Sequence, residues 1–309
     1  MNQKITAIVI VSVLSLSLLF SACGKKPAAE SITPSASPEL TAGPSPSAVD
    51  QYPLIVKAGS TVTSDLNGDG KEDEVYFEPN EDRTAILSLS VNGTDFAKSL
   101  YGQELYTDNL EPSYYCITDI DASDNSLEIA IMDYGPSSDY MTYFFRYDGT
   151  GLKYIGNISG MIINSFSDKS DLTFNGDGTV DSYMRLSVLQ TWWSAAEWWL
   201  TDSSLELVDQ DLYYPVCPSG FGEDPHTEVT ALIDIIAYEK NSLSSPKSTL
   251  PAGTALTLVA TDDKEWVQAK AADDKQCWIH LDSEYGQSVE TPNGYVYSTD
   301  VFSGLLFAD

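Results

Sequence analysis

The feature that most constrains the fold is a set of three acidic turns at one spacing. Asn67, Asp121 and Asn175 are separated by 54 residues in each step. The surrounding stretches are DLNGDGKEDEVYF (65–77), DIDASDNSLEIAI (119–131) and TFNGDGTVDSYMR (173–185), and each places an acidic turn before a strand-like run. A fixed period of this length is typical of stacked supersecondary units. The sequence therefore predicts about three repeated units.

Short runs with β character fill the space between the acidic turns. They are AILSLSV (85–91), YMTYFFRY (140–147), LKYIGNI (152–158) and MRLSVLQTWW (184–193). Dipeptides that favour turns separate them, such as Asn92-Gly93 and Asp148-Gly149. Helical periodicity is scarce over residues 51–215. We therefore expect an all-β fold with about four strands per unit, as in a propeller blade.

The first acidic turn has the composition of a calcium loop. Ca²⁺ takes six to eight oxygen ligands, and a loop supplies them at alternate positions. Side-chain oxygens occupy positions 1, 3, 5 and 9, the Lys71 carbonyl would serve at position 7, and Gly70 permits the sharp turn. The predicted ligands are Asp65, Asn67, Asp69, Lys71 and Asp73. An EF-hand would have Glu at position 12, where this chain has Tyr76.

The second and third turns match this pattern less well. The second offers a weaker candidate site, formed by Asp119, Asp121, Ser123, Asp124 and Glu128. The third begins with Thr173, and its Asn-Gly-Asp-Gly run is also typical of a tight hairpin. A solvated polar turn without metal is the alternative interpretation of each.

The loop Asp65, Asn67, Asp69, Gly70 and Asp73 resembles the DxNxDGxxD turn of the integrin-type FG-GAP or VCBS repeats. That resemblance implies β-propeller blades in which the turn joins two strands. It also implies that calcium is bound as a structural ion. If all three units count, the resemblance covers residues 51–218.

The N-terminus carries a targeting pattern. Lys4 precedes an apolar run over residues 5–20, and Ser21-Ala22-Cys23-Gly24 follows. This resembles the cleavage box of bacterial lipoproteins, which implies a signal peptide over 1–22 and a lipid on Cys23. A plain secretory signal or a single spanning helix is the alternative. Residues 23–50 are rich in Pro and Ser and are expected to be a linker. The expected location is extracytoplasmic, anchored to the bacterial cell membrane.

The character of the chain changes at about residue 226. The stretch LPAGTALTLVATDDKEWVQAKAADDKQCWIHL contains short alternating strands and resembles a bacterial SH3-like domain. Gly253, Trp266, Trp278 and Ile279 carry the resemblance, while Cys277 replaces the usual glycine. We therefore predict a small SH3-like barrel in 226–309, with an extension from 284 that has no assigned place. Trp266 and Trp278 are candidate ligand-binding residues, and core packing is the alternative.

Cysteine and tryptophan usage leaves further alternatives open. Three cysteines follow Cys23, and either Cys217 pairs with Cys277 or all three, including Cys116, are small buried thiols. In WWSAAEWW (192–199) a strand would send one member of each tryptophan pair to each face. Either all four are packed inside, or one of each pair is exposed as a platform for sugars or peptides.

The charge balance limits the partners. Acidic residues number 46 against 16 basic ones, for a formal net charge of -30. This argues against nucleic acid and against electrostatic binding to anionic lipid. No catalytic motif accompanies the two histidines, His226 and His280. We therefore expect a non-enzymatic protein that binds a cell-wall polymer, a glycan or an envelope protein. The alternatives are a carboxylate-based hydrolase and a non-binding structural subunit.

Overall fold

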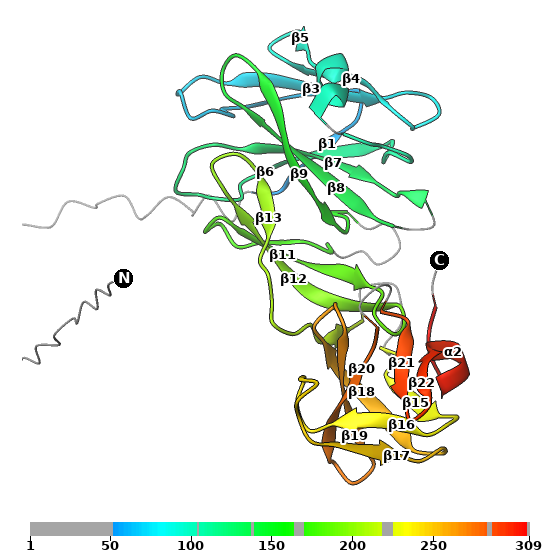
Figure 1. Ribbon diagram of the computed structural model, residues 1–309. Helices are drawn as coiled ribbons and strands as arrows, with labels where there is room; N and C mark the ends of the chain where they lie inside the picture. The colour runs from blue at the N-terminus through cyan, green and yellow to red at the C-terminus, as the bar shows by residue number, and fades with distance from the viewer. Residues whose placement is uncertain are drawn as a thin grey trace, which may run out of the picture. The chain divides into compact units, whose positions relative to one another are not determined.

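The computed structural model describes residues 52–103, 105–136, 139–163, 170–217, 225–282 and 286–307. The predicted signal peptide, Cys23 and the linker up to residue 50 lie outside these residues. Residues 46–309 form one compact unit. The described chain is all-β, as predicted, and its only helices are short: α1 (Ala97–Leu100), the 3-10 helix η2 (Tyr101–Gln103) and α2 (Ser298–Val301) (Figure 1).

Three antiparallel meanders follow one another along the chain (Figure 1). The first sheet contains β2 (Thr61–Ser64), β3 (Asp73–Pro79), β4 (Ile86–Val91) and β5 (Thr94–Asp95). The second contains β6 (Tyr114–Thr118), β7 (Glu128–Asp133), β8 (Met141–Tyr147) and β9 (Leu152–Ser159), with β1 (Leu54–Lys57) added beside β6. The third contains β10 (Thr173–Phe174), β11 (Thr179–Leu186), β12 (Trp192–Leu200) and β13 (Leu205–Leu207), with β14 (Pro215–Val216) on β12. In each meander an acidic turn joins the first strand to the second.

The second sheet is covered on both faces. Every residue of β7 is buried, which explains the continuous apolar run EIAIM after the acidic turn. Ile129 and Ile131 join a core with the first sheet, whereas Ala130 and Met132 join a separate core with the third sheet. Alternate side chains of one strand therefore hold two neighbouring sheets.

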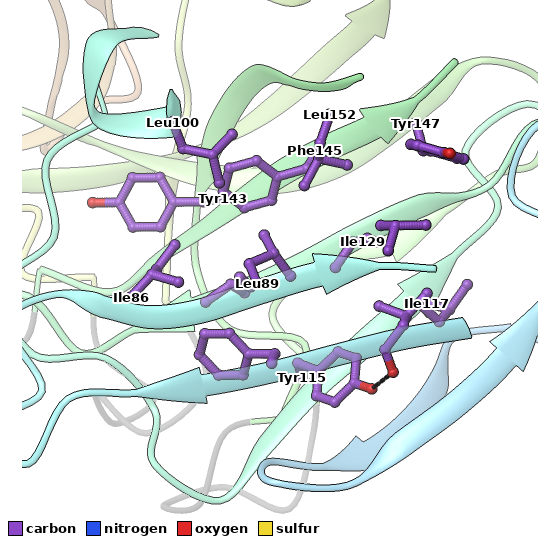
Figure 2. Packing of buried hydrophobic residues seen from close by; sticks show 14 of the residues in the cluster. Ile86, Leu89, Leu100, Tyr115, Ile117, Ile129, Tyr143, Phe145, Tyr147 and Leu152 are labelled. Atoms are coloured by element: carbon purple, nitrogen blue, oxygen red, sulfur yellow. Dashed lines mark hydrogen bonds between the residues drawn. The ribbon is translucent and has the colours of Figure 1, made fainter. Parts of the chain in front are cut away.

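The core between the first and second sheets is rich in aromatic residues. Figure 2 shows Ile86 and Leu89 of β4 together with Ile129, Tyr143 and Phe145 of the second sheet. The Tyr115 hydroxyl donates a 3.0 Å hydrogen bond to the Val75 carbonyl, which links the two sheets through a buried polar contact (Figure 2). Burying each such side chain contributes about 1.5–3 kcal/mol.

The opposite face of the first sheet is polar. Its residues alternate with the core residues along β2, β3 and β4, and they are Thr61, Thr63, Glu74, Tyr76, Glu78, Ser88 and Ser90. A terminal unit of a stacked array needs such an outer face to remain soluble. The first sheet is therefore built to end the array.

A seven-stranded sheet follows the third meander. Its order is β17-β16-β20-β19-β18-β15-β23, with bounds β15 (Glu228–Ala231), β16 (Ile235–Tyr238), β17 (Lys247–Leu250), β18 (Ala255–Thr261), β19 (Trp266–Ala271), β20 (Gln276–His280) and β23 (Phe302–Ser303). The extension that had no assigned place supplies β23, which pairs with β15, and a hairpin of β21 (Ser288–Thr291) and β22 (Gly294–Tyr297).

Two predicted strands are each broken into two. The run 184–193 is interrupted after Leu186, because Leu189 takes a φ of 71° and its N–H donates to the Gly286 carbonyl. The run 229–238 divides into β15 and β16, which pair with different strands of the seven-stranded sheet. Alternation of apolar residues continued through both breaks, so the pattern did not reveal them.

The cysteine and tryptophan predictions are resolved by burial. Cys277 is a free, buried thiol, so the predicted Cys217–Cys277 disulfide is wrong. Cys116 is also free and buried. Trp192 is almost fully buried, whereas Trp199 is 52% exposed. The expectation that one tryptophan of a pair can face solvent is therefore confirmed for Trp199.

Candidate functional site

In the first acidic turn, side-chain oxygens converge on the backbone of the loop. The Asp69 N–H donates to Oδ1 of both Asp65 and Asn67, at 3.1 Å each. Oδ2 of Asp65 also accepts the Gly70 N–H at 2.8 Å, and Oδ1 of Asp69 accepts the Lys71 N–H at 2.9 Å. These bonds are Asx turns, which fold the chain tightly without strands or helices. Oxygens of Asp65 and Asn67 therefore lie around one backbone nitrogen.

Asp73 closes this turn at the start of β3. Its Oδ2 accepts the Leu66 N–H at 3.1 Å, and its Oδ1 accepts the side-chain amide of Asn92 at 2.7 Å. The residue is buried. Because each carboxylate oxygen has two acceptor positions, these bonds leave one free on each oxygen.

Lys71 pairs with Asp69 at the exposed side of the same turn, with Nζ 3.1 Å from Oδ2. The side-chain hydrogen bond from Lys71 lowers the pKa of Asp69, and the Lys71 backbone N–H adds to this effect. Both side chains are exposed, so the pair itself contributes little stability.

The second turn closes in the same way with a longer acid. Thr118 pairs with Glu128 as Ser64 pairs with Asp73. Oε2 of Glu128 accepts the Ile120 N–H at 3.1 Å, which corresponds to the bond from Leu66 in the first turn. The sequence comparison had aligned Glu128 with Glu74. The second turn is one residue longer, so Glu128 takes the position of Asp73.

A protein cation occupies the second turn. The Arg146 guanidinium on β8 contacts Oε1 of Glu128, and its Nη2 lies 3.0 Å from Oδ2 of Asp124. Burial raises the pKa of Glu128 to about 7, against the opposing attraction of Arg146. Two of the five predicted ligands of the second site are thus bound to an arginine side chain.

Asp119, the first residue of the second turn, is buried with Oδ1 lacking a hydrogen-bond partner among the described residues. Burial raises its pKa, and the nearby charges of Asp124 and Asp121 act in the same direction. Asp121 behaves differently, because hydrogen bonds from Ser123 lower its pKa. The second turn therefore holds one carboxylate for which the surrounding protein supplies no donor.

The three turns lie side by side. The Leu127 N–H donates to the Leu66 carbonyl at 2.9 Å, and the Gly178 N–H donates to the Ile120 carbonyl at 3.0 Å. The third turn is a tight hairpin, closed by a 3.1 Å bond from the Asn175 N–H to the Thr179 carbonyl. The spacing of 54 residues in the sequence thus corresponds to direct contact between successive turns.

Within the described ranges, no three His, Cys, Asp or Glu side chains gather in a group that could hold a metal ion. The predicted first site also relies on the Asn67 amide oxygen and the Lys71 carbonyl, which are hard oxygen ligands. The convergence of Asp65 and Asn67 oxygens fits an oxygen-liganded cation. In the second turn, Arg146 already neutralises part of the charge.

Trp266 and Trp278 lie on the same face of the seven-stranded sheet and differ in exposure. Trp266 is buried, with its ring centroid 4.6 Å from that of His280 and 5.3 Å from that of Tyr238. Trp278 is only partly buried. Tyr295 of the terminal hairpin bonds Nδ1 of His280 at 2.7 Å, a contact that no sequence pattern indicated. Core packing is thus the role of Trp266.

No protein-family model matches the chain, and neither curated proteins nor solved structures gave a significant match. The helices found in the described part of the chain are too short or too polar to cross a membrane.

Proposed function

We propose that the protein is a lipid-anchored, extracytoplasmic binding protein whose N-terminal meanders are propeller-type blades in an open stack. A structural calcium ion would be held in the first turn by Asp65, Asn67, Asp69, Asp73 and the Lys71 carbonyl. The C-terminal sheet would be an SH3-like domain. The partner would be a cell-wall polymer, a glycan or an envelope protein.

The observation that carries this proposal is the repeated turn. Successive meanders of four strands place equivalent turns at equivalent positions, and neighbouring turns bond to one another. A cation in the first turn would neutralise its carboxylates and fix the edge shared with the second turn. Its role is structural, because calcium supplies charge and geometry there and no reaction is required of it.

The test is thermal unfolding of the purified chain in EDTA and in millimolar calcium. An ion that binds only the folded state stabilises it by about 2.7 kcal/mol at a hundredfold excess over its Kd. We expect a rise of several degrees in Tm that Asp69→Ala removes. Asp177→Ala in the third turn is the matched control and should retain the rise. A Tm that calcium leaves unchanged would remove the ion from the proposal.

The lipid anchor and the absence of catalysis are tested separately. Labelling with a radioactive fatty acid should mark the wild-type chain and not Cys23→Ala. Incubation with cell-wall glycans and peptides should release no products. Release of products would favour the carboxylate-based hydrolase instead. Recovery only in a stable membrane complex would favour the structural subunit.

A further inference from the structure

A groove lies on the third meander, away from the calcium turns. It has a volume of about 530 Å³ and is lined by Asp181, Ser182, Ala195, Ala196, Glu197, Val208 and Gln210. Small side chains of β11 and β12 form part of it. The Gln210 amide bonds the Ala195 carbonyl at 3.2 Å, and the Val208 N–H bonds the Glu197 carbonyl at 2.8 Å. The segment after β13 therefore forms a fixed wall of the groove.

Exposed aromatic rings lie next to the groove along the chain. Trp199 follows Glu197 by two residues on the same strand, so its side chain shares a face with Glu197. It is 52% exposed. Tyr214, which is 55% exposed, precedes Pro215, the partner of Ser194 beside the groove residue Ala195. Large exposed rings of this kind are stacking surfaces for flat or ring-shaped ligands.

The same face concentrates negative charge. Asp181 and Glu197 are directly opposite each other on β11 and β12, and Glu206 is opposite Trp199 on β13. Like charges directly across a strand pair destabilise the sheet. Among these three acids, Asp181 accepts a 3.2 Å bond from Asn175 and Glu206 accepts one from Ser204, and neither donor is charged. A cationic ligand would relieve this repulsion.

We propose that this groove binds a polysaccharide that carries free amino groups, such as a polymer of glucosamine. The sugar rings stack on Trp199, and the ammonium groups pair with Asp181 and Glu197. The Gln210 side chain is in place to bond ring hydroxyls. The inference deepens the proposed function, on which it rests, by assigning the glycan class and the surface that recognises it.

The test is calorimetric titration of the full chain in detergent with a glucosamine hexamer. The comparison ligands are the fully N-acetylated hexamer and hexalysine. We expect the glucosamine hexamer to bind and the acetylated one to bind at least tenfold more weakly, since the ammonium is lost. Trp199→Ala and Glu197→Gln should each weaken binding by about tenfold. Tyr106→Ala and Glu74→Gln, at exposed positions on other elements, should change it less than twofold.

Three outcomes would overturn the inference. They are equal binding of the acetylated hexamer, binding that Trp199→Ala leaves intact, and hexalysine binding that matches the glucosamine hexamer and depends equally on Trp199. In the last case the groove would recognise a basic peptide. Absence of glycan binding together with a calcium-dependent Tm would overturn only this inference and leave the proposed calcium site standing.

Discussion

At the scale of single residues, two glycines of the first turn separate backbone strain from contact between turns. Gly68 and Gly70 both have positive φ, 68° and 83°. A Cβ on Gly68 would lie 2.6 Å from the Asn125 carbonyl oxygen in the second turn, whereas a Cβ on Gly70 would meet nothing within 4 Å. Gly68 is therefore needed for the close approach of the two turns.

We predict that Gly68→Ala destabilises the protein by about 2 kcal/mol more than Gly70→Ala. Both substitutions strain the backbone by roughly 1 kcal/mol, and only the first forces the turns apart. Urea denaturation in EDTA measures the difference without a contribution from calcium. Equal losses in the two variants would show that the turns do not pack as described.

Glu128 should make stability fall as pH rises. Its pKa of about 7 in the folded protein exceeds the model value of 4.5, because the carboxyl is buried. Between these pH values the folded state holds the extra proton, so the free energy of unfolding decreases as pH increases. One group with this shift accounts for at most about 3 kcal/mol.

The measurement compares denaturation of the wild-type chain and Glu128→Gln from pH 4.5 to 7.5. The variant should show a shallower decline with pH, because it cannot release that proton. Glu74→Gln, at an exposed position on β3, is the control and should follow the wild type. Parallel curves for the wild type and Glu128→Gln would contradict the prediction.

At the scale of elements, β7 carries the two cores of the meanders. We predict that Ile131→Ala costs about 2–5 kcal/mol, because it leaves a cavity in the core between the first two sheets. Leu87→Ala on β4 is the control, since Leu87 is 58% exposed and should change stability by less than about 0.5 kcal/mol. Chemical denaturation with both variants checks the difference.

The strand pattern and the period of 54 residues could be predicted from the sequence because both rest on local signals. Acidic turn residues, Asn-Gly dipeptides and alternating apolar residues mark each strand and hairpin. The equivalence of Leu66 and Ile120, whose N–H groups bond the closing acids of their turns, follows from the same spacing.

Contacts across strands could not be predicted. Arg146 reaches Glu128 from the neighbouring strand, and no spacing rule indicates that an arginine enters an acidic turn. The extra residue in the second turn shifted Glu128 by one position, which only the pairing of Thr118 with Glu128 reveals. The burial of Trp266 likewise depends on Tyr295, Glu290 and the hairpin that holds them, which lie beyond the recognisable strands.

At the scale of the whole molecule, the third meander shares a core with the C-terminal sheet. Leu186, Leu189 and Trp192 pack in one cluster with Val229, Leu256 and Ile279. We therefore predict that residues 51–218 and 226–309 unfold together, in a single calorimetric transition whose calorimetric and van't Hoff enthalpies agree. Two separate transitions would show that the two regions are independent.

The polar outer face of the first sheet has a consequence for how the chain folds as it is made. A growing chain emerges from its N-terminus, so the first sheet is complete before the sheet that covers its apolar side exists. Its other side already suits water. Each later sheet then covers the apolar side left by the one before it, and the C-terminal sheet covers the last. Order of emergence and order of burial coincide, so at most one uncovered apolar surface is presented to chaperones or to aggregation at any stage.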